Sequence, residues 1–314
     1  PHDDRPEHGR GRRAHLMAQA VLLACDWGTT NLRAWTLDAA GAIVAQSEFP
    51  LGVSKLAPGE APGRFESEVR PGLDAQGLPA ILCGMVGSNL GWAVAPYADC
   101  PAGMADLAAS LTAVADDVRI VPGLRCEGIA GSPDVMRGEE TQVLGWLAQH
   151  ADRRVGRHLV CHPGTHAKWV LVEDGRIVRF VTAMTGELFA VLSRHSLLRS
   201  DAPADDEAAF DQGLAAAGQG DALAARLFTA RARVVGGHAQ AESTPSYLSG
   251  LLIGAEVASV PRLLGEPARR VNLLGDAELC DRYRRALRRA GVEVEAFDGE
   301  AAAIAGLFAL GAPP

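Results

Sequence analysis

Apolar and polar residues alternate along the chain in two similar blocks, one near the start and one in the middle. Each block has three apolar runs joined by short polar turns, a pattern typical of an antiparallel β-meander. The runs span residues 21–25, 32–37 and 43–49 in the first block and 158–161, 168–172 and 177–181 in the second. Two like meanders predict two like domains.

The first turn of each block has a similar sequence. In ACDWGTTNLRAW and in CHPGTHAKWVLV, an apolar run precedes a glycine, a threonine follows it, and a second apolar run comes next. Gly28 aligns with Gly164 in this comparison. A tight turn of this composition presents backbone N–H groups and hydroxyls, which suit phosphate oxygens. Two such turns facing each other could hold one polyphosphate from both sides.

Helices and further strands are predicted for the rest of the chain. The expected strands are 81–84, 119–121, 270–274 and 292–297, and the expected helices are 104–115, 139–150, 188–195, 205–214, 222–235, 248–260, 278–290 and a last one from residue 300. This order predicts an α/β protein. We place the first domain at residues 19–155 and the second at 156–314. The charge-mixed polar tail at residues 1–18 is predicted to be disordered.

Composition limits the expected partners and location. A chain of 314 residues, 48% of them hydrophobic, can form about two domains with sizeable cores. The formal net charge of −8 gives no support for a nucleic-acid-binding surface. The apolar runs fall short of the ~20 residues of a membrane span, and the six cysteines show no CxxC spacing. We therefore expect a cytoplasmic protein with reduced thiols and neither a membrane nor a nucleic-acid partner.

Asp26 is the first polar residue of the first turn. A carboxylate repels phosphate, so its expected role is to hold Mg²⁺ together with the phosphates of a substrate. The alternative is an aspartate that forms the turn by bonding to its own loop. His162 has the corresponding place in the second block, where we expect a structural residue.

Several stretches resemble known proteins. DWGTTNLR resembles the DxGTTxxR phosphate turn of the actin, hexokinase and Hsp70 ATPase superfamily. Five further stretches are similar to the 2-dehydro-3-deoxygalactonokinase family: CGMVGSNLGWAVAPY, PDVMRGEETQVLG, PGTHAKWVLV, MTGELF and LSGLLIGAEV. The resemblance implies two ribonuclease-H-like domains of the actin-like ATPase fold, with a nucleotide cleft between them. It also implies ATP-dependent phosphorylation of the 6-hydroxyl of 2-dehydro-3-deoxy-D-galactonate.

The resemblance also implies roles for the residues of both turns. The first phosphate turn would comprise Gly28, Thr29, Thr30 and Asn31, with Asp26 on the metal and Arg33 near the transferred phosphate, and the second would comprise Gly164, Thr165 and His166. The adenosine-side turn of relatives usually reads Gly-Gly-Ser or Gly-Ser-Ser, but here it is Gly275-Asp276. A carboxylate at this place could accept from ribose hydroxyls or could disfavour ATP relative to another donor.

Two segments are candidates for binding the sugar acid. The glycine-rich segment after the strand at 81–84 would open onto the cleft, unless it is an ordinary surface loop. It offers Gly87, Ser88 and Asn89 as neutral contacts and Trp92 as a surface for stacking on a sugar. Arg137 could pair with the substrate carboxylate or with a neighbouring acid.

Glu139 and Glu140 begin the helix at 139–150, where sugar kinases of this superfamily commonly have a catalytic acid. The alternative is that they only complement the helix dipole, for roughly 0.3–1 kcal/mol. Successive helical residues point about 100° apart, so only one can face the cleft, and we expect Glu139 to be the base. Lys168, one of two lysines, could contact phosphate or could be a solvated strand residue.

Together these features predict a carbohydrate kinase that uses ATP and Mg²⁺. One alternative is a kinase for another sugar acid or an anhydro-sugar. Another is a non-catalytic sensor that binds nucleotide with the same fold. The oligomeric state, a homodimer included, stays open.

Overall fold

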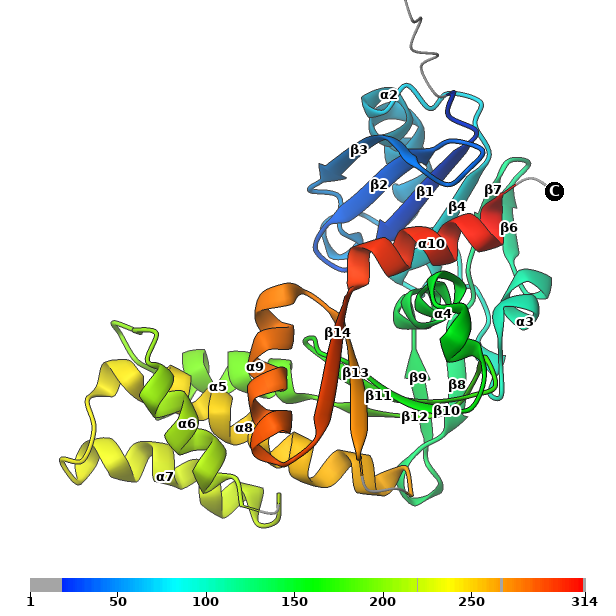
Figure 1. The fold of residues 1–314 in the computed structure, drawn as a ribbon. Helices are drawn as coiled ribbons and strands as arrows, with labels where there is room; N and C mark the ends of the chain where they lie inside the picture. Colours follow the sequence, from blue (N-terminus) through cyan, green and yellow to red (C-terminus); the bar gives the residue numbers. More distant parts are fainter. Residues whose placement is uncertain (1–18, 219, 266–267, 313–314) are drawn as a thin grey trace, which may run out of the picture.

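The structure is a computed structural model that describes residues 19–218, 220–265 and 268–312. These residues form two lobes, each built on its own β-sheet, as Figure 1 shows. The tail at residues 1–18, predicted to be disordered, lies outside the described residues.

The sheet of the first lobe has six strands in the order β3-β2-β1-β4-β7-β6. Their bounds are β1 Leu22–Trp27, β2 Leu32–Leu37, β3 Ile43–Phe49, β4 Ala80–Gly84, β6 Thr112–Ala115 and β7 Val118–Ile120. The first three strands form the predicted antiparallel meander, and β4 and β7 continue the sheet in parallel.

The sheet of the second lobe repeats this topology with five strands in the order β12-β11-β10-β13-β14. Their bounds are β10 Arg157–His162, β11 Ala167–Glu173, β12 Arg176–Ala183, β13 Arg270–Gly275 and β14 Glu293–Asp298. An antiparallel meander is again followed by two parallel strands. The duplicated, ribonuclease-H-like architecture is therefore confirmed.

Helices and short elements surround the two sheets. The helices are α1 Ala61–Arg64, a π-helical turn Phe65–Val69, α2 Arg70–Gly72, α3 Met104–Ala109, α4 Glu139–Gln149, α5 Thr185–His195, α6 Glu207–Ala216, α7 Leu223–Val235, α8 Thr244–Leu263, α9 Ala277–Arg289 and α10 Gly299–Gly311. Three further strands, β5 Ala98–Asp99, β8 Leu124–Glu127 and β9 Pro133–Met136, form a small third sheet. Turns of 3₁₀ helix lie at Val53–Lys55, Met85–Gly87, Ile129–Gly131, Ala151–Arg154 and Ala241–Ser243.

The central core lies between the two main sheets. Side chains alternate across β1, so that Leu23, Cys25 and Trp27 pack toward Phe65 on one face. The other face, which includes Leu22, packs with α4, α10 and side chains of the second sheet. The helices α4 and α10 therefore fill the space between the lobes (Figure 1).

The last helix returns from the second lobe to the first. It follows β14 directly and packs against α4, β1 and β4. The two helices cross closely at glycines, because a Cβ on Gly145 would lie 1.9 Å from the carbonyl oxygen of Ala302. By sequence α10 belongs to the second lobe, but by packing it belongs to the first. The packing of α4 against α10 therefore links the two lobes.

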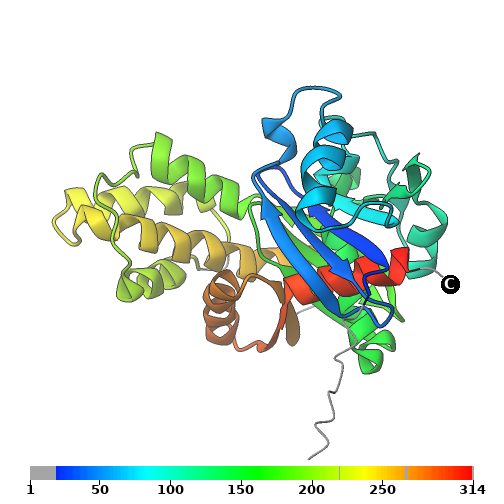
Figure 2. The same ribbon diagram turned by 90° about the horizontal axis from the view of Figure 1, so that it is seen from above.

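The outer face of the second sheet is covered by α8 and α9. Helices α5, α6 and α7 extend from α8 as a small bundle, seen on the left of Figure 2. Within the described ranges, every helix is too short or too polar to span a bilayer.

The second half of the helix predicted at 104–115 is wrong. Helix α3 ends at Ala109, and Thr112–Ala115 forms strand β6, which pairs with β7. The strand forms because its backbone completes the edge of the sheet, a tertiary effect that outweighs local propensity. The helical segment at 61–72 and the small third sheet were not predicted.

Candidate active site

An ion pair joins the two strands that flank the first turn. Asp26 on β1 and Arg33 on β2 are directly opposite in the strand register, and Arg33 Nη2 lies 2.6 Å from Asp26 Oδ2. Within the described ranges, Asp26 Oδ1 accepts only a long contact of 3.9 Å from the Cys83 thiol. Arg33 also lies 3.6 Å from Glu300 of α10. One carboxylate oxygen of Asp26 thus remains without a strong donor.

Residues 52–54 cover the carbonyl side of the first turn. The turn is closed by a hydrogen bond of 2.9 Å from the Gly28 amide to the Asn31 carbonyl. The amides of residues 52–54 donate to the carbonyl groups of residues 28–30 at 3.1 Å each. Gly52 is required for this approach, because a Cβ there would lie 2.1 Å from the carbonyl carbon of Thr30. The Asn31 side chain points to Glu48 of β3, 2.5 Å away.

The second turn is covered in the same way by the start of α5. A Cβ on Gly186 would lie 2.5 Å from the Gly164 carbonyl oxygen, and the Glu187 amide donates to Thr165 at 3.0 Å. The imidazole of His166 bonds to the Glu187 carboxylate. Gly52 and Gly186 each stand third after the last strand of their meander. The repeat therefore includes a supporting glycine that the sequence comparison did not identify.

The residues flanking the second turn reach toward the first lobe. His162 on β10 and Lys168 on β11 are opposite in register, like Asp26 and Arg33. The His162 Nε2 lies 2.8 Å from the side-chain oxygen of Gln142, and Lys168 Nζ lies 3.2 Å from Glu139 Oε1. Burial lowers the pKa of His162, the Glu139 charge opposes this, and the Lys168 charge adds to it, so the neutral imidazole is favoured. Both contacts join the second sheet to α4.

The two glutamates that begin α4 differ sharply in their surroundings. The Glu139 side chain is 20% exposed, and its Oε2 accepts from the Arg137 amide at 3.0 Å. Glu140 is fully buried, and its oxygens accept from the Gly138 amide at 2.7 Å and the Thr141 hydroxyl at 3.0 Å. Burial, followed by the neighbouring Glu139 charge, raises the pKa of Glu140 to about 8. Only Glu139 is partly open.

Arg137 has buried donors without partners. Its Nη2 donates to the Ala95 carbonyl at 2.7 Å, and the guanidinium carbon lies 4.4 Å from the centre of the Tyr97 ring. Its Nε and Nη1 are buried and have no hydrogen-bond partner among the residues that the structure describes. A Cβ on Gly87 would lie 2.7 Å from Nη1. The segment around residue 87 is thus fitted closely to this guanidinium.

The other residues of the glycine-rich segment are partly used by the fold. The Ser88 hydroxyl donates to the Met85 carbonyl at 2.7 Å. The Trp92 ring packs against Phe65, with centroids 5.4 Å apart. Asn89 is exposed. Of the predicted sugar-acid contacts, Arg137 is therefore the one whose buried donors the fold has not already taken up.

Two adjoining cavities lie beside the second turn. The larger, of about 860 Å³, is lined by Gly164 and Thr165, by the turn at Gly275, and by Arg33 and Glu300 from the first-lobe side. The smaller, of about 390 Å³, shares Gly164 and Thr165 and extends between α5, α8 and α9. Of the described residues, the first-turn set Gly28–Asn31 and Glu139 line neither cavity.

Asp276 has a structural role at the adenosine-side turn. Its side chain is the N-cap of α9 and accepts a hydrogen bond of 3.0 Å from the Leu279 amide. Aspartate is among the residues preferred at this position. The departure from the glycine and serine of relatives is thus explained locally by the start of a helix, although Asp276 also lines both cavities.

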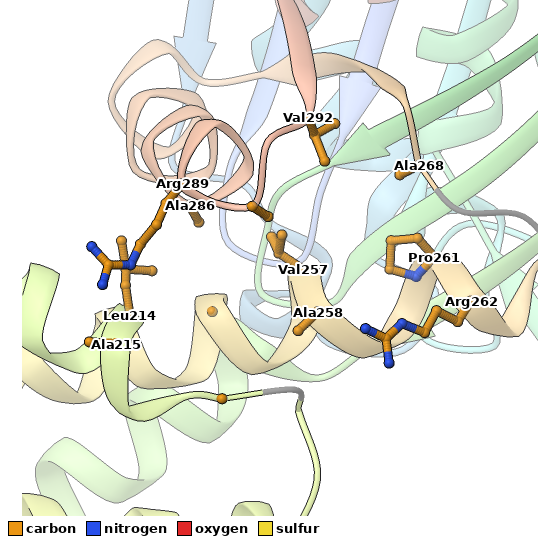
Figure 3. A pocket seen from close by; sticks show the side chains of 13 residues that line it. Leu214, Ala215, Val257, Ala258, Pro261, Arg262, Ala268, Ala286, Arg289 and Val292 are labelled. Atoms are coloured by element: carbon orange, nitrogen blue, oxygen red, sulfur yellow. The ribbon is translucent and has the colours of Figure 1, made fainter.

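A third cavity of about 450 Å³ lies at the opposite end of α9, between α6, α8 and α9. Figure 3 shows its lining, in which apolar side chains such as Leu214, Val257 and Val292 lie together with the side chains of Arg262 and Arg289. None of the predicted site residues is among its lining residues. It is therefore separate from the two cavities beside the turns.

Comparison with known proteins agrees with this geometry. A family described as 2-keto-3-deoxy-galactonokinase has a sequence model that matches residues 26–310. The chain belongs to this family. The match begins at Asp26 and ends within α10, so it includes both lobes and both turns.

Relatives of similar length carry the same enzyme name. A Rhizobium meliloti (strain 1021) protein named as a probable 2-dehydro-3-deoxygalactonokinase is 39% identical, over 91% of this chain and 95% of its own. The 2-dehydro-3-deoxygalactonokinase of Escherichia coli (strain K12) is 38% identical, over 92% and 96%. A crystal structure from Sinorhizobium meliloti with this enzyme name superposes with a TM-score of 0.82 at 38% identity, covering 92% and 97%.

Some residues of the site were missed or discounted at the sequence level. Gln142 stands three residues after Glu139, so helical spacing could have placed it on the same face of α4. His162 was expected to be structural, but it lines the larger cavity. Glu300 contacts Arg33 from a distant part of the chain, and no local pattern indicates this.

Proposed function

We propose that this protein transfers the γ-phosphoryl group of ATP to the 6-hydroxyl of 2-dehydro-3-deoxy-D-galactonate. The family and the names of its relatives support the reaction class and the substrate. The observation that carries the mechanism is the 3.2 Å contact between Glu139 of α4 and Lys168 beside the second turn. It joins a partly exposed acid to the strand that leaves the turn.

The two turns hold the phosphates from opposite lobes. The Gly28 amide closes the first turn, and residues 52–54 take up the carbonyl groups of residues 28–30. The later amides of the turn and its threonine hydroxyls are therefore the groups that bind an anion. The second turn supplies Gly164 and Thr165 from the wall of the larger cavity. The nucleoside lies in the smaller cavity, where Phe189, Leu252 and Ile253 form apolar walls.

Asp26 fits a role as the magnesium carboxylate. Magnesium in kinases is commonly held by one or two carboxylates together with phosphate and water. One oxygen of Asp26 pairs with Arg33, and the other has only the long thiol contact. In the described part of the chain, no group of three or more His, Cys, Asp or Glu could hold a metal alone, which agrees with a site completed by phosphate. The ion supplies charge neutralisation on the phosphates when bound.

Glu139 acts as the general base. It accepts the proton of the 6-hydroxyl as that oxygen bonds to the γ-phosphorus, and the bond from the γ-phosphorus to the bridging oxygen of ADP breaks. Arg33 and Lys168 offset negative charge on the transferred group, since such transfer depends mainly on positioning and electrostatics. Glu140 supports the helix start from the interior, where its oxygens are already bonded.

Arg137 binds the substrate carboxylate. Its unpartnered Nε and Nη1 are the donors that a carboxylate would satisfy. Both atoms are covered by protein, so the segment that carries Tyr97 is expected to shift when the acid binds.

All six cysteines are free thiols, which supports a reducing, cytoplasmic location.

The test is a panel of sugar acids and neutral sugars, with ADP formation and the phosphorylated product measured. Fast turnover with 2-dehydro-3-deoxygalactonate, and phosphate on its terminal oxygen by ³¹P NMR, is the expected result. Preference for the gluconate epimer or an anhydro-sugar would assign another substrate. Nucleotide binding without turnover on the whole panel would favour a sensor.

A further inference from the structure

A buried carboxylate lies in the second lobe, apart from the acids discussed above. Glu256 on α8 is 4% exposed. Its Oε1 accepts from the Trp169 indole at 2.6 Å, and its Oε2 accepts from the Tyr283 phenol at 2.8 Å. Burial raises the pKa of Glu256, and hydrogen bonds from Thr185, Trp169 and Tyr283 oppose that rise. The site thus offers donors to both oxygens.

Stability alone does not account for this residue. Moving a carboxylate out of water is costly, and replacing both partners of a buried hydrogen bond by apolar groups of the same shape can be nearly neutral. Among the described residues, no positively charged group is among those that act on Glu256. The carboxylate is therefore held by neutral donors only, an arrangement that fixes those donors in place.

The donors belong to the elements around the proposed nucleoside cavity. Thr185 begins α5 and Tyr283 lies in α9, and both line the smaller cavity. The third wall is formed by residues of α8 that precede Glu256. Trp169 lies on β11, the strand that leaves the second turn. One carboxylate thus joins the three helices that enclose the cavity to the strand beside the phosphates.

We propose that Glu256 is a positioning residue for the nucleotide, which fixes Tyr283 and Thr185 and so sets the shape of the nucleoside cavity. This rests on the proposed function, in which that cavity takes the nucleoside. Among the described residues, Glu256 accepts hydrogen bonds from Trp169, Tyr283 and Thr185, none of which belongs to a phosphate turn or to α4. Its loss should therefore weaken nucleotide binding and leave phosphoryl transfer intact.

The test is Glu256→Gln, which keeps the size of the side chain. The new amide NH₂ would face either the Trp169 indole or the Tyr283 phenol, both of which donate to the native carboxylate. The KM for ATP should rise about tenfold, while kcat at saturating ATP and the KM for the sugar acid stay within about twofold. The matched control is Val257→Ala. Val257 is the next residue of α8 and faces the third cavity, between α6, α8 and α9 (Figure 3). Its truncation therefore loosens the same helix without touching the carboxylate.

Thermal unfolding of both variants measures the structural cost. If Val257→Ala lowers the melting temperature as much as Glu256→Gln and leaves the KM for ATP unchanged, the positioning role is supported. An equal rise in KM for both variants would overturn it, because general loosening would then suffice. An unchanged KM in Glu256→Gln would overturn it as well.

Tyr283→Phe keeps the inference testable if Glu256→Gln does not fold. This change removes only the phenol oxygen, and it should also raise the KM for ATP with little change in kcat. If both variants fold, their double mutant should show less than the sum of the two effects. A normal KM in Tyr283→Phe contradicts the inference. Absence of sugar-dependent ADP formation by the wild type would instead contradict the proposed function.

Discussion

The two lobes carry equivalent residue pairs with different chemistry. Asp26 and Arg33 lie opposite each other on the first two strands of the first meander. His162 and Lys168 have the same positions in the second meander. The first pair is closed within its own lobe by a 2.6 Å ion pair. The second pair instead points to α4, at Gln142 and Glu139.

This difference shows how a duplicated turn can acquire two roles. The backbone of each turn is conserved between the lobes, including a glycine behind it, at Gly52 and Gly186. The flanking side chains diverge: the first lobe has a carboxylate suited to a metal, and the second has a neutral imidazole and an ammonium. In the proposed mechanism, the first turn therefore serves the cation, and the residues that flank the second turn position the helix that carries the base.

The largest effect is expected at Glu139, the residue that Lys168 contacts. Glu139→Gln removes the proton acceptor and should lower kcat by about 10²–10⁴ with little change in affinity for ATP. Glu140→Gln, its neighbour, should lose less, because Glu140 is fully buried. Steady-state kinetics and a nucleotide titration give both values. If Glu140→Gln proved the more damaged variant, the base would be Glu140, and two near-normal variants would exclude both.

The first pair is tested by Asp26→Asn. The turn should keep its shape while kcat falls by at least about 10²-fold, because the magnesium carboxylate is lost. The equivalent change in the second lobe, His162→Asn, should have a smaller effect on kcat, since its contact is with Gln142. Near wild-type activity of Asp26→Asn at saturating Mg²⁺ would refute the difference between the pairs.

Lys168 distinguishes base positioning from phosphate binding. Lys168→Met should lower kcat by about tenfold, because Glu139 loses a 3.2 Å contact and the transferred group loses a positive charge, and should change the KM for ATP less. Lys55, the other lysine, is exposed on a 3₁₀ turn, so Lys55→Met serves as the control. A rise in KM for ATP at constant kcat would mean that Lys168 binds phosphate instead.

A different kind of effect, on the stability of the fold, is expected at Glu140. Its pKa is about 8 in the fold against 4.5 for the free group, so the folded state keeps a proton that the unfolded state has lost. The free energy of unfolding should therefore fall as the pH rises from 4.5 to 8, by up to ~1.4 kcal/mol per pH unit. Urea unfolding across this range should show a shallower slope for Glu140→Gln. Equal slopes would show that Glu140 does not titrate as described.

The sequence predicted the repeated parts of the fold better than the unique ones. Strands β2 and β3 have the predicted bounds, because alternation and turn residues are local signals. The strand at Thr112–Ala115 was taken for a helix, because its pairing with β7 depends on the assembled sheet. The short strands of the third sheet likewise depend on tertiary pairing.

The same limit applies to the site. The turns, Asp26 and the acids of α4 could be proposed from local motifs and helical spacing. Glu300 and Glu256 could not, because their contacts with Arg33 and Tyr283 require the chain to return from distant positions. The contact of Gly52 with the first turn could not be predicted either. A glycine after a strand indicates only a turn, and its close approach to Thr30 is known only from the folded structure.

If both turns bind one polyphosphate, a valine at either turn glycine should weaken nucleotide binding. A Cβ on Gly28 would meet protein only at 3.4 Å, and one on Gly164 would meet nothing within 4 Å. Both variants should therefore fold, and any loss reports on the ligand. Gly63, in α1, also has open space, so Gly63→Val is the control. In a calorimetric titration with ATP and Mg²⁺, we expect Gly28→Val and Gly164→Val each to raise the Kd while Gly63→Val does not. If only one of the two turn variants weakens binding, the turns do not share the nucleotide.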